Sequence, residues 1–116
     1  MNWIYVFIGG GLGSILRYSL SLLLVRFVPQ FPIATFFSNF LSTLLVAFFT
    51  FVIVKKFDNT WIHPLLIIGF CGGLSTFSTF SLETANLIQM GNFGLAILNI
   101  ILSLLICIVM VLILYK

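Results

Sequence analysis

The stretch GFCGGLSTFSTFSLE, residues 69–83, decides the architecture of this 116-residue chain. Apolar residues flank it as in a membrane span, yet two adjacent glycines are followed by five hydroxyl side chains. Such a composition is poor for a continuous helix. We therefore expect a span that is broken over residues 72–79. A break exposes backbone carbonyls, which can hold a cation, and helix N-terminal N–H groups, which favour anions.

The remainder of the chain is strongly apolar, with 62% hydrophobic and only 6% charged residues. A soluble domain has about a quarter of its residues charged. Four spans of roughly 20 residues each use about 80 residues and leave little for loops. The composition excludes a soluble enzyme, a disordered chain and a separate regulatory domain. The five basic residues are scattered, so the net charge of +3 predicts no nucleic-acid partner.

These features predict an all-α membrane protein with a single four-span transmembrane domain over residues 1–116. The expected spans are residues 3–25, 33–54, 65–89 and 93–115. Pro29 and Pro32 bracket the first loop, and Lys55 and Lys56 close the second span. The first span lacks the flanks of a cleaved signal peptide, so we expect it to be retained. The basic residues favour an N-terminus on the inside of the membrane by only three to one. This weak bias is compatible with insertion in both orientations.

The first span contains GGGLGSILRY, residues 9–18. Small residues at Gly9, Gly13 and Ser14 let two helices approach closely. Arg17 lies too deep for easy snorkelling, so its donors need acceptors such as helix-end carbonyls or Glu83. We expect a structural or gating role for Arg17.

Polar residues also recur at helical spacing in the second and fourth spans. Thr35 and Asn39 share one face, which Ser42 and Thr43 continue. This face either makes interhelical hydrogen bonds or donates to an anion. In the fourth span the spacing i, i+4, i+8 joins Asn99, Ser103 and Cys107 in one weakly polar stripe, for which helix packing is the favoured interpretation.

Phe77 and Phe80 also lie on one helix face. Phenylalanines at this spacing usually serve packing, but here hydroxyl residues surround them. The partially positive ring edges can meet a small anion. Cys71 and Cys107 form no C-x-x-C motif and are expected as buried thiols. His63 is isolated, and no nucleophile–base pair indicates an enzyme.

Together these motifs resemble the Fluc/CrcB family of small fluoride channels over nearly the whole chain. The family pattern GG-x-x-GA-x-x-R-Y corresponds to GGGLGSILRY here, and G-T-x-x-V-N-x-x-G corresponds to ATFFSNFLS. The third-span pattern G-F-C-G-G-x-T-T-F-S-T-F corresponds to GFCGGLSTFSTF. The resemblance implies passive, selective export of fluoride across the bacterial plasma (inner) membrane. It also implies an antiparallel, dual-topology dimer in the lipid bilayer, with two pores and a central structural sodium ion.

The resemblance further implies roles for individual residues. Backbone carbonyls of Gly72 and Ser75 would hold the sodium ion, while Arg17 and Glu83 would have structural or gating roles. The implied fluoride pore comprises Thr35, Asn39, Phe77, Thr79, Phe80 and Ser103.

Some positions depart from the family pattern. The second span has Ala34 for the family glycine, and Ser75 replaces a threonine. Asn99 stands where many members have tyrosine, and Cys107 where a second hydroxyl is common. The chain could therefore form a homodimer, or be a heterodimer subunit that is inactive alone. A small proton-coupled anion transporter is the further alternative, with Glu83 and Arg17 as the only candidate relay groups.

Overall fold

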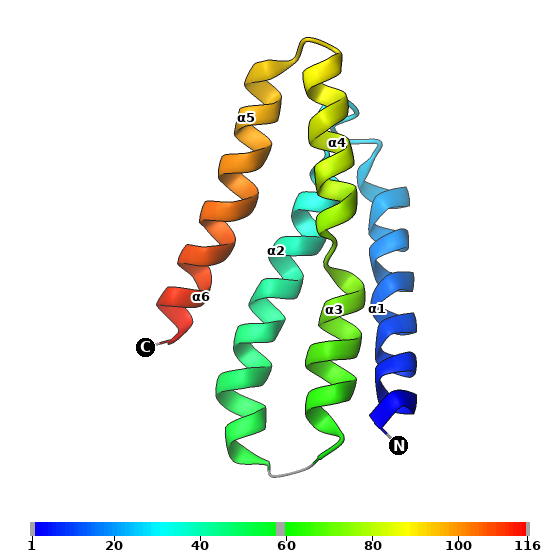
Figure 1. Ribbon diagram of the computed structural model, residues 1–116, viewed down its shortest axis with the longest axis vertical. Coiled ribbons are helices and arrows are strands. Elements are labelled where there is room, and N and C mark those ends of the chain that lie inside the picture. The colour runs from blue at the N-terminus through cyan, green and yellow to red at the C-terminus, as the bar shows by residue number, and fades with distance from the viewer. Residues whose placement is uncertain (1, 58–59, 116) are drawn as a thin grey trace.

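The computed structural model describes residues 2–57 and 60–115, apart from the side chain of Val54, and these residues contain no strand. Four helices are long and apolar enough to cross a membrane: Asn2–Leu24, Ile33–Ile53, His63–Gln89 and Phe93–Tyr115. Their bounds differ from the expected spans by at most two residues. The individual elements are α1 (Asn2–Leu24), α2 (Ile33–Phe48), η1 (Phe49–Val54), η2 (His63–Cys71), α3 (Gly72–Leu74), α4 (Phe77–Gln89), α5 (Phe93–Ile101), η3 (Leu102–Ile106) and α6 (Cys107–Tyr115). The elements labelled η are π-helical stretches that continue or precede α-helices. The first, second and fourth spans are each one continuous helix in Figure 1, whereas the third is divided between α3 and α4.

Short connections place consecutive spans antiparallel (Figure 1). The tightest turn joins α4 to α5 through Gly91, whose φ of +80° lies in the left-handed region. The Gly91 N–H donates to the carbonyl of Ile88, and the Asn92 N–H donates to the carbonyl of Leu87. This paired pattern ends a helix by satisfying its last carbonyls, and glycine adopts the required conformation without steric cost.

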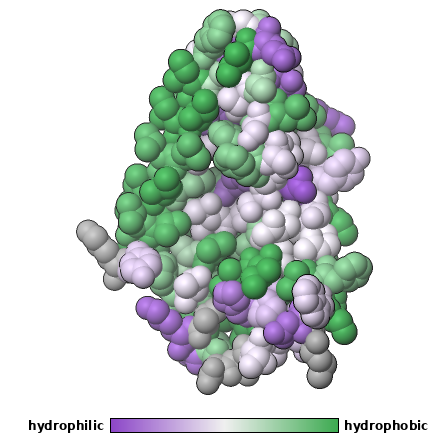
Figure 2. All heavy atoms as spheres, in the orientation of Figure 1, coloured by the Kyte–Doolittle hydropathy of each residue, from purple (hydrophilic) through white to green (hydrophobic). Residues whose placement is uncertain are grey.

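The distribution of side chains is the reverse of that in a soluble domain. Large apolar residues are exposed along every span, and Figure 2 shows them gathered over α5 and α6. The buried set is instead rich in small and polar residues, among them Ser38, Ser42 and Asn99. Polar groups turned inward and apolar groups turned outward suit a bundle that is surrounded by hydrocarbon.

Glycines bring α1 into close contact with the third span. A Cβ at Gly9 would collide with the carbonyl of Leu65, and one at Gly13 would collide with the carbonyl of Phe70. The expectation that these glycines allow close approach is confirmed. Gly73 on the opposite side would likewise meet the carbonyl of Gly10. The two backbones therefore pack directly against each other.

Between α3 and α4 the chain is extended at two residues, Ser75 (φ −81°, ψ 155°) and Thr76 (φ −153°, ψ 125°). The expected interruption over residues 72–79 was too long, because Gly72 and Gly73 remain helical in α3. Gly73 serves the contact with α1 instead of unwinding the chain. Helix α4 restarts at Phe77 because the Thr76 hydroxyl oxygen accepts a hydrogen bond from the Thr79 N–H at 3.2 Å.

Candidate functional site

The side chain of Asn39 bridges helix α2 to the extended residues. Its Oδ1 accepts from the Thr76 N–H at 2.7 Å, and its Nδ2 donates to the Thr76 carbonyl at 3.1 Å. The side-chain amide thus pairs with both the N–H and the carbonyl of Thr76, as the backbone of a neighbouring strand would. One of its two N–H groups is used in this contact. Sequence reasoning placed Asn39 on an anion path, and the structure adds this bridging contact.

The interruption also redirects backbone donors. In a continuous helix the N–H groups of Thr76 and Thr79 would donate to the carbonyls of Gly72 and Ser75. They donate instead to Asn39 Oδ1 and to the Thr76 hydroxyl. The carbonyls of Gly72 and Ser75 therefore lose their helical donors. These two residues are the expected sodium ligands.

Arg17 reaches the same place from α1. Its Nε donates to the carbonyl of Gly73 at 3.1 Å, which matches the expectation that it needs a helix-end carbonyl. The other expected acceptor, Glu83, is engaged by α2, because the Thr35 hydroxyl donates to Glu83 Oε1 at 2.9 Å. The guanidinium thus satisfies a carbonyl that the interruption would otherwise leave without a donor.

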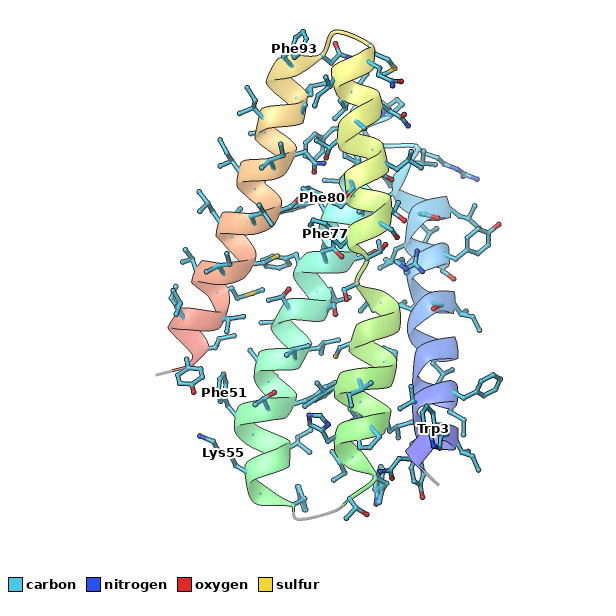
Figure 3. All side chains as sticks on the ribbon, in the orientation of Figure 1. Trp3, Phe51, Lys55, Phe77, Phe80 and Phe93 are labelled. Carbon is cyan, nitrogen blue, oxygen red and sulfur yellow. The ribbon has the colours of Figure 1, made fainter. Side chains whose placement is uncertain are left out.

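The two phenylalanines lie beside the start of α4 (Figure 3). Their ring centroids are 5.5 Å apart and the rings are inclined by 38°. Phe80 is buried, with 7% of its surface exposed, whereas Phe77 is 71% exposed on the single chain. The pair therefore extends from the protein interior to the outer surface at the depth of the interruption.

A second polar cluster joins α5 and η3 to α4. Asn99, which is 1% exposed, donates through Nδ2 to the Thr84 hydroxyl at 2.9 Å, and Ser103 donates to Asn99 Oδ1 at 3.2 Å. Thr84 in turn donates to the Phe80 carbonyl at 2.7 Å. These hydrogen bonds support the packing interpretation of Asn99 and Ser103, and the pore role of Ser103 stays a prediction. Sequence reasoning missed Thr84, although its position four residues after Phe80 was a usable signal.

A cavity of about 510 Å³ lies among α1, the start of α2, the loop between them and α4. The polar side chains on its wall include Arg17, Thr35, Ser38, Thr76, Thr79 and Glu83. Two buried atoms of these residues have no hydrogen-bond partner among residues 2–57 and 60–115: Ser38 Oγ and Glu83 Oε2. Sequence reasoning also missed Ser38.

Most of the expected site residues lie in one of two places, the wall of the cavity or the cluster around Asn99. Thr35, Thr79, Glu83 and Arg17 share the cavity wall. Phe80 and Ser103 belong to the Asn99 cluster, and Asn39 adjoins the cavity through Thr76. Within the described residues, no group of three or more His, Cys, Asp or Glu side chains is placed to hold a metal ion.

The fold and this arrangement define a small multi-pass helical membrane protein whose polar groups gather at one interrupted span. The family model described as CrcB-like protein, Camphor Resistance (CrcB), matches residues 4–114. The chain belongs to the CrcB family.

Several relatives have the name fluoride-specific ion channel FluC. The relative from Coxiella burnetii (strain CbuK_Q154) is 41% identical over 111 residues, which cover 93% of this chain and 90% of the relative. The one from Salmonella arizonae is 45% identical over 105 residues, covering 86% and 80%. The one from Hydrogenobaculum sp. is 40% identical over 94 residues, covering 80% and 77%. These matches confirm the expectation that the chain is not an enzyme.

Proposed function

We propose that this chain forms a fluoride-selective channel that exports fluoride passively from the bacterial cytoplasm. The observation that carries the proposal is a row of neutral hydrogen-bond donors where α2 meets the start of α4 at the interrupted span. We call this row the donor seam, and it comprises Thr35, Asn39, Thr76 and Thr79. Neutral donors at membrane depth stabilise an anion without the tight binding that a full opposite charge would cause. The name of the relatives supports fluoride as the transported ion.

Two donors of this seam have a hydrogen with no acceptor in the described ranges 2–57 and 60–115, which makes them available to an anion. Asn39 uses one amide N–H on the Thr76 carbonyl and keeps the other. Thr79 accepts from the Thr76 hydroxyl at 3.2 Å, so its own hydroxyl hydrogen has no acceptor within the described part of the chain. We assign the donation to fluoride principally to Asn39 and Thr79.

Thr35 and Ser103, two other proposed pore residues, contribute differently from Asn39 and Thr79. Thr35 uses its hydroxyl hydrogen on Glu83, and Ser103 uses its hydrogen on Asn99. In these contacts each hydroxyl presents lone pairs rather than a hydrogen. Thr35 and Ser103 therefore shape the polar wall of the pore, and they donate to fluoride only when those hydrogen bonds open.

Phe77 and Phe80 would provide the aromatic part of the path. Ring edges carry partial positive charge, so they can replace some of the water around a small anion and still release it. The contact between the two rings at the interruption supports a continuous aromatic surface. The exposure of Phe77 on one subunit supports completion of that surface by a second subunit.

A second copy of the chain, or a paired homologue, would complete the pore as an antiparallel dimer with two pores. Polar backbone at membrane depth is tolerated only where protein or a water-filled cavity surrounds it. Gly72 is exposed on the single chain, and its carbonyl and that of Ser75 have lost their helical donors. A partner chain would cover these groups.

The same two carbonyls fit a sodium ion, because unwound backbone carbonyls are ligands for monovalent cations in membrane proteins. When bound, the ion would supply a fixed positive charge that satisfies carbonyls from both subunits. Replacing sodium by a large organic cation should lower the thermal stability of the purified dimer. An unchanged melting temperature together with unchanged fluoride flux would remove sodium from the proposal.

The decisive experiment is fluoride efflux from liposomes that contain this chain alone, with chloride efflux as the selectivity control. Rapid fluoride efflux without chloride efflux is expected. Efflux at limiting dilution should disappear from liposomes that contain a single subunit. Folded protein that conducts only after a paired homologue is added would identify a heterodimer subunit.

The free oxygen of Glu83 favours a second candidate, a proton-coupled anion transporter. Its Oε2 is buried at the cavity wall with no hydrogen-bond partner in the part of the chain that the structure describes, and a proton could bind there. This function requires that proton and fluoride movement are coupled in a constant ratio. Simultaneous recording of both ions in the same liposomes separates it from a passive channel.

A further inference from the structure

Ser38 is the most completely buried hydroxyl of the cavity wall. Its exposed fraction is 0%, and its Oγ has no hydrogen-bond partner among the described residues. Buried polar groups in native proteins are nearly always satisfied, by protein, water or an ion, so each exception requires an explanation. Ser42, one turn further along α2, shows the ordinary case, because its hydroxyl donates to the carbonyl of Cys71 at 2.7 Å.

The contacts on either side of Ser38 determine what it faces. Thr35 is bonded to Glu83 and Asn39 is bonded to Thr76, so α2 and α4 run past each other in opposite directions. Ser38 lies between these contacts on α2, and Thr79 lies between them on α4. Both residues line the same cavity. Two hydroxyl groups with unused hydrogens therefore share one section of its wall.

The charges around this section suit a small anion that binds weakly. Arg17 and Glu83 both line the cavity, and the Thr35 hydroxyl donates to Glu83 Oε1 at 2.9 Å. Because its lining has one basic and one acidic residue, the cavity wall has no net formal charge, and the hydroxyl hydrogens provide the remaining attraction. A serine side chain has one heavy-atom torsion, so Oγ can turn between wall and cavity without movement of the backbone.

We propose that Ser38 and Thr79 form a binding site for fluoride at the cavity wall. The Ser38 hydroxyl, on the residue directly before Asn39 in the chain, is an additional donor in this site. This inference rests on the proposed channel function. The ligand is a small acceptor of hydrogen bonds, a chemistry that fluoride shares with water. Fluoride dependence therefore separates the two in the test.

The test compares Ser38→Ala with Ser42→Ala, two buried serines of one helix. Fluoride flux is measured in liposomes over a range of fluoride concentrations, and thermal unfolding is measured in detergent with added fluoride or chloride. Ser38→Ala should unfold at the parental temperature or above, because it removes a hydroxyl that bonds to none of the described residues. Its flux at low fluoride should fall about tenfold, as expected for one hydrogen bond to a charged group. Ser42→Ala should instead lower the unfolding temperature and leave the fluoride dependence of flux unchanged.

Ser38→Thr retains the hydroxyl and should recover most of the flux at low fluoride. If Ser38→Ala keeps the parental fluoride dependence, Ser38 binds water only or nothing, and the inference is wrong. That outcome, obtained with a parent chain that conducts fluoride, leaves the channel function intact. A parent that conducts no fluoride, alone or with a paired homologue, overturns both.

Discussion

Asn39→Asp separates the two roles of the Asn39 amide, which are to hold the extended backbone and to donate to an anion. Aspartate preserves the oxygen that accepts from the Thr76 N–H at 2.7 Å. It replaces the Nδ2 donor, 3.1 Å from the Thr76 carbonyl, by an oxygen that cannot donate. The change keeps shape and volume, removes every donor hydrogen of the side chain, and adds negative charge.

The expected magnitudes differ for folding and for transport. Loss of the hydrogen bond and of the donor for a part-buried carbonyl should cost about 2–4 kcal/mol of unfolding free energy. A like charge about 4 Å from a permeating anion adds about 4 kcal/mol of repulsion at an effective dielectric constant of 20. That repulsion corresponds to a rate that is lower by about a thousandfold. Flux should therefore fall far more than the folded population does.

Fluoride efflux from liposomes gives the rate, and thermal unfolding in detergent gives the stability. Thr43→Val is the matched control, because the Thr43 hydroxyl donates only to the carbonyl of Asn39 in its own helix at 2.7 Å. This control should keep parental flux. A folded Asn39→Asp dimer that conducts fluoride within twofold of the parent would refute the anion path at Asn39 and leave it a packing residue.

Four further substitutions, with one control, test other parts of the structure. Phe80→Ile and Phe77→Ile keep most of the apolar volume and remove the ring edges, so fluoride flux should drop strongly. The dimer mass measured by size exclusion should stay parental. If both variants conduct fluoride like the parent, the rings serve only packing. Glu83→Gln keeps an oxygen that can accept from the Thr35 hydroxyl, so this variant should still conduct fluoride, without proton movement. If the parent shows a proton current and Glu83→Gln abolishes it, the result supports the transporter. Gly13→Ala forces a Cβ into the backbone of the third span and should cost about 1–3 kcal/mol of stability by thermal unfolding, whereas Gly11→Ala, with nothing within 4 Å of the added Cβ, should not destabilise the protein.

The sequence alone was sufficient to establish the class of protein and the place of its polar site. Four apolar stretches of sufficient length, separated by short loops, can fold only as membrane helices, because hydrocarbon leaves no other partner for their backbone groups. The hydroxyl residues after Gly72 and Gly73 indicated the third span as the candidate site, since polar groups at membrane depth are a hypothesis of function. Small residues at Gly9 and Gly13 indicated close helix contact, because their lack of a side chain is itself the geometric requirement.

Only the tertiary structure decided how each polar group is used. Local sequence did not show that the interruption is limited to Ser75 and Thr76, because Gly73 is held helical by its contact with α1. Spacing placed Asn39 on a polar face, but its pairing with Thr76 joins residues 37 positions apart in the chain. Ser38 and Ser42 are both buried serines on α2, and only the helices packed against them give the Ser42 hydroxyl a partner and leave the Ser38 hydroxyl without one among the described residues. Hydrogen-bond partners depend on distances between helices, and these are determined by the packing of the whole bundle.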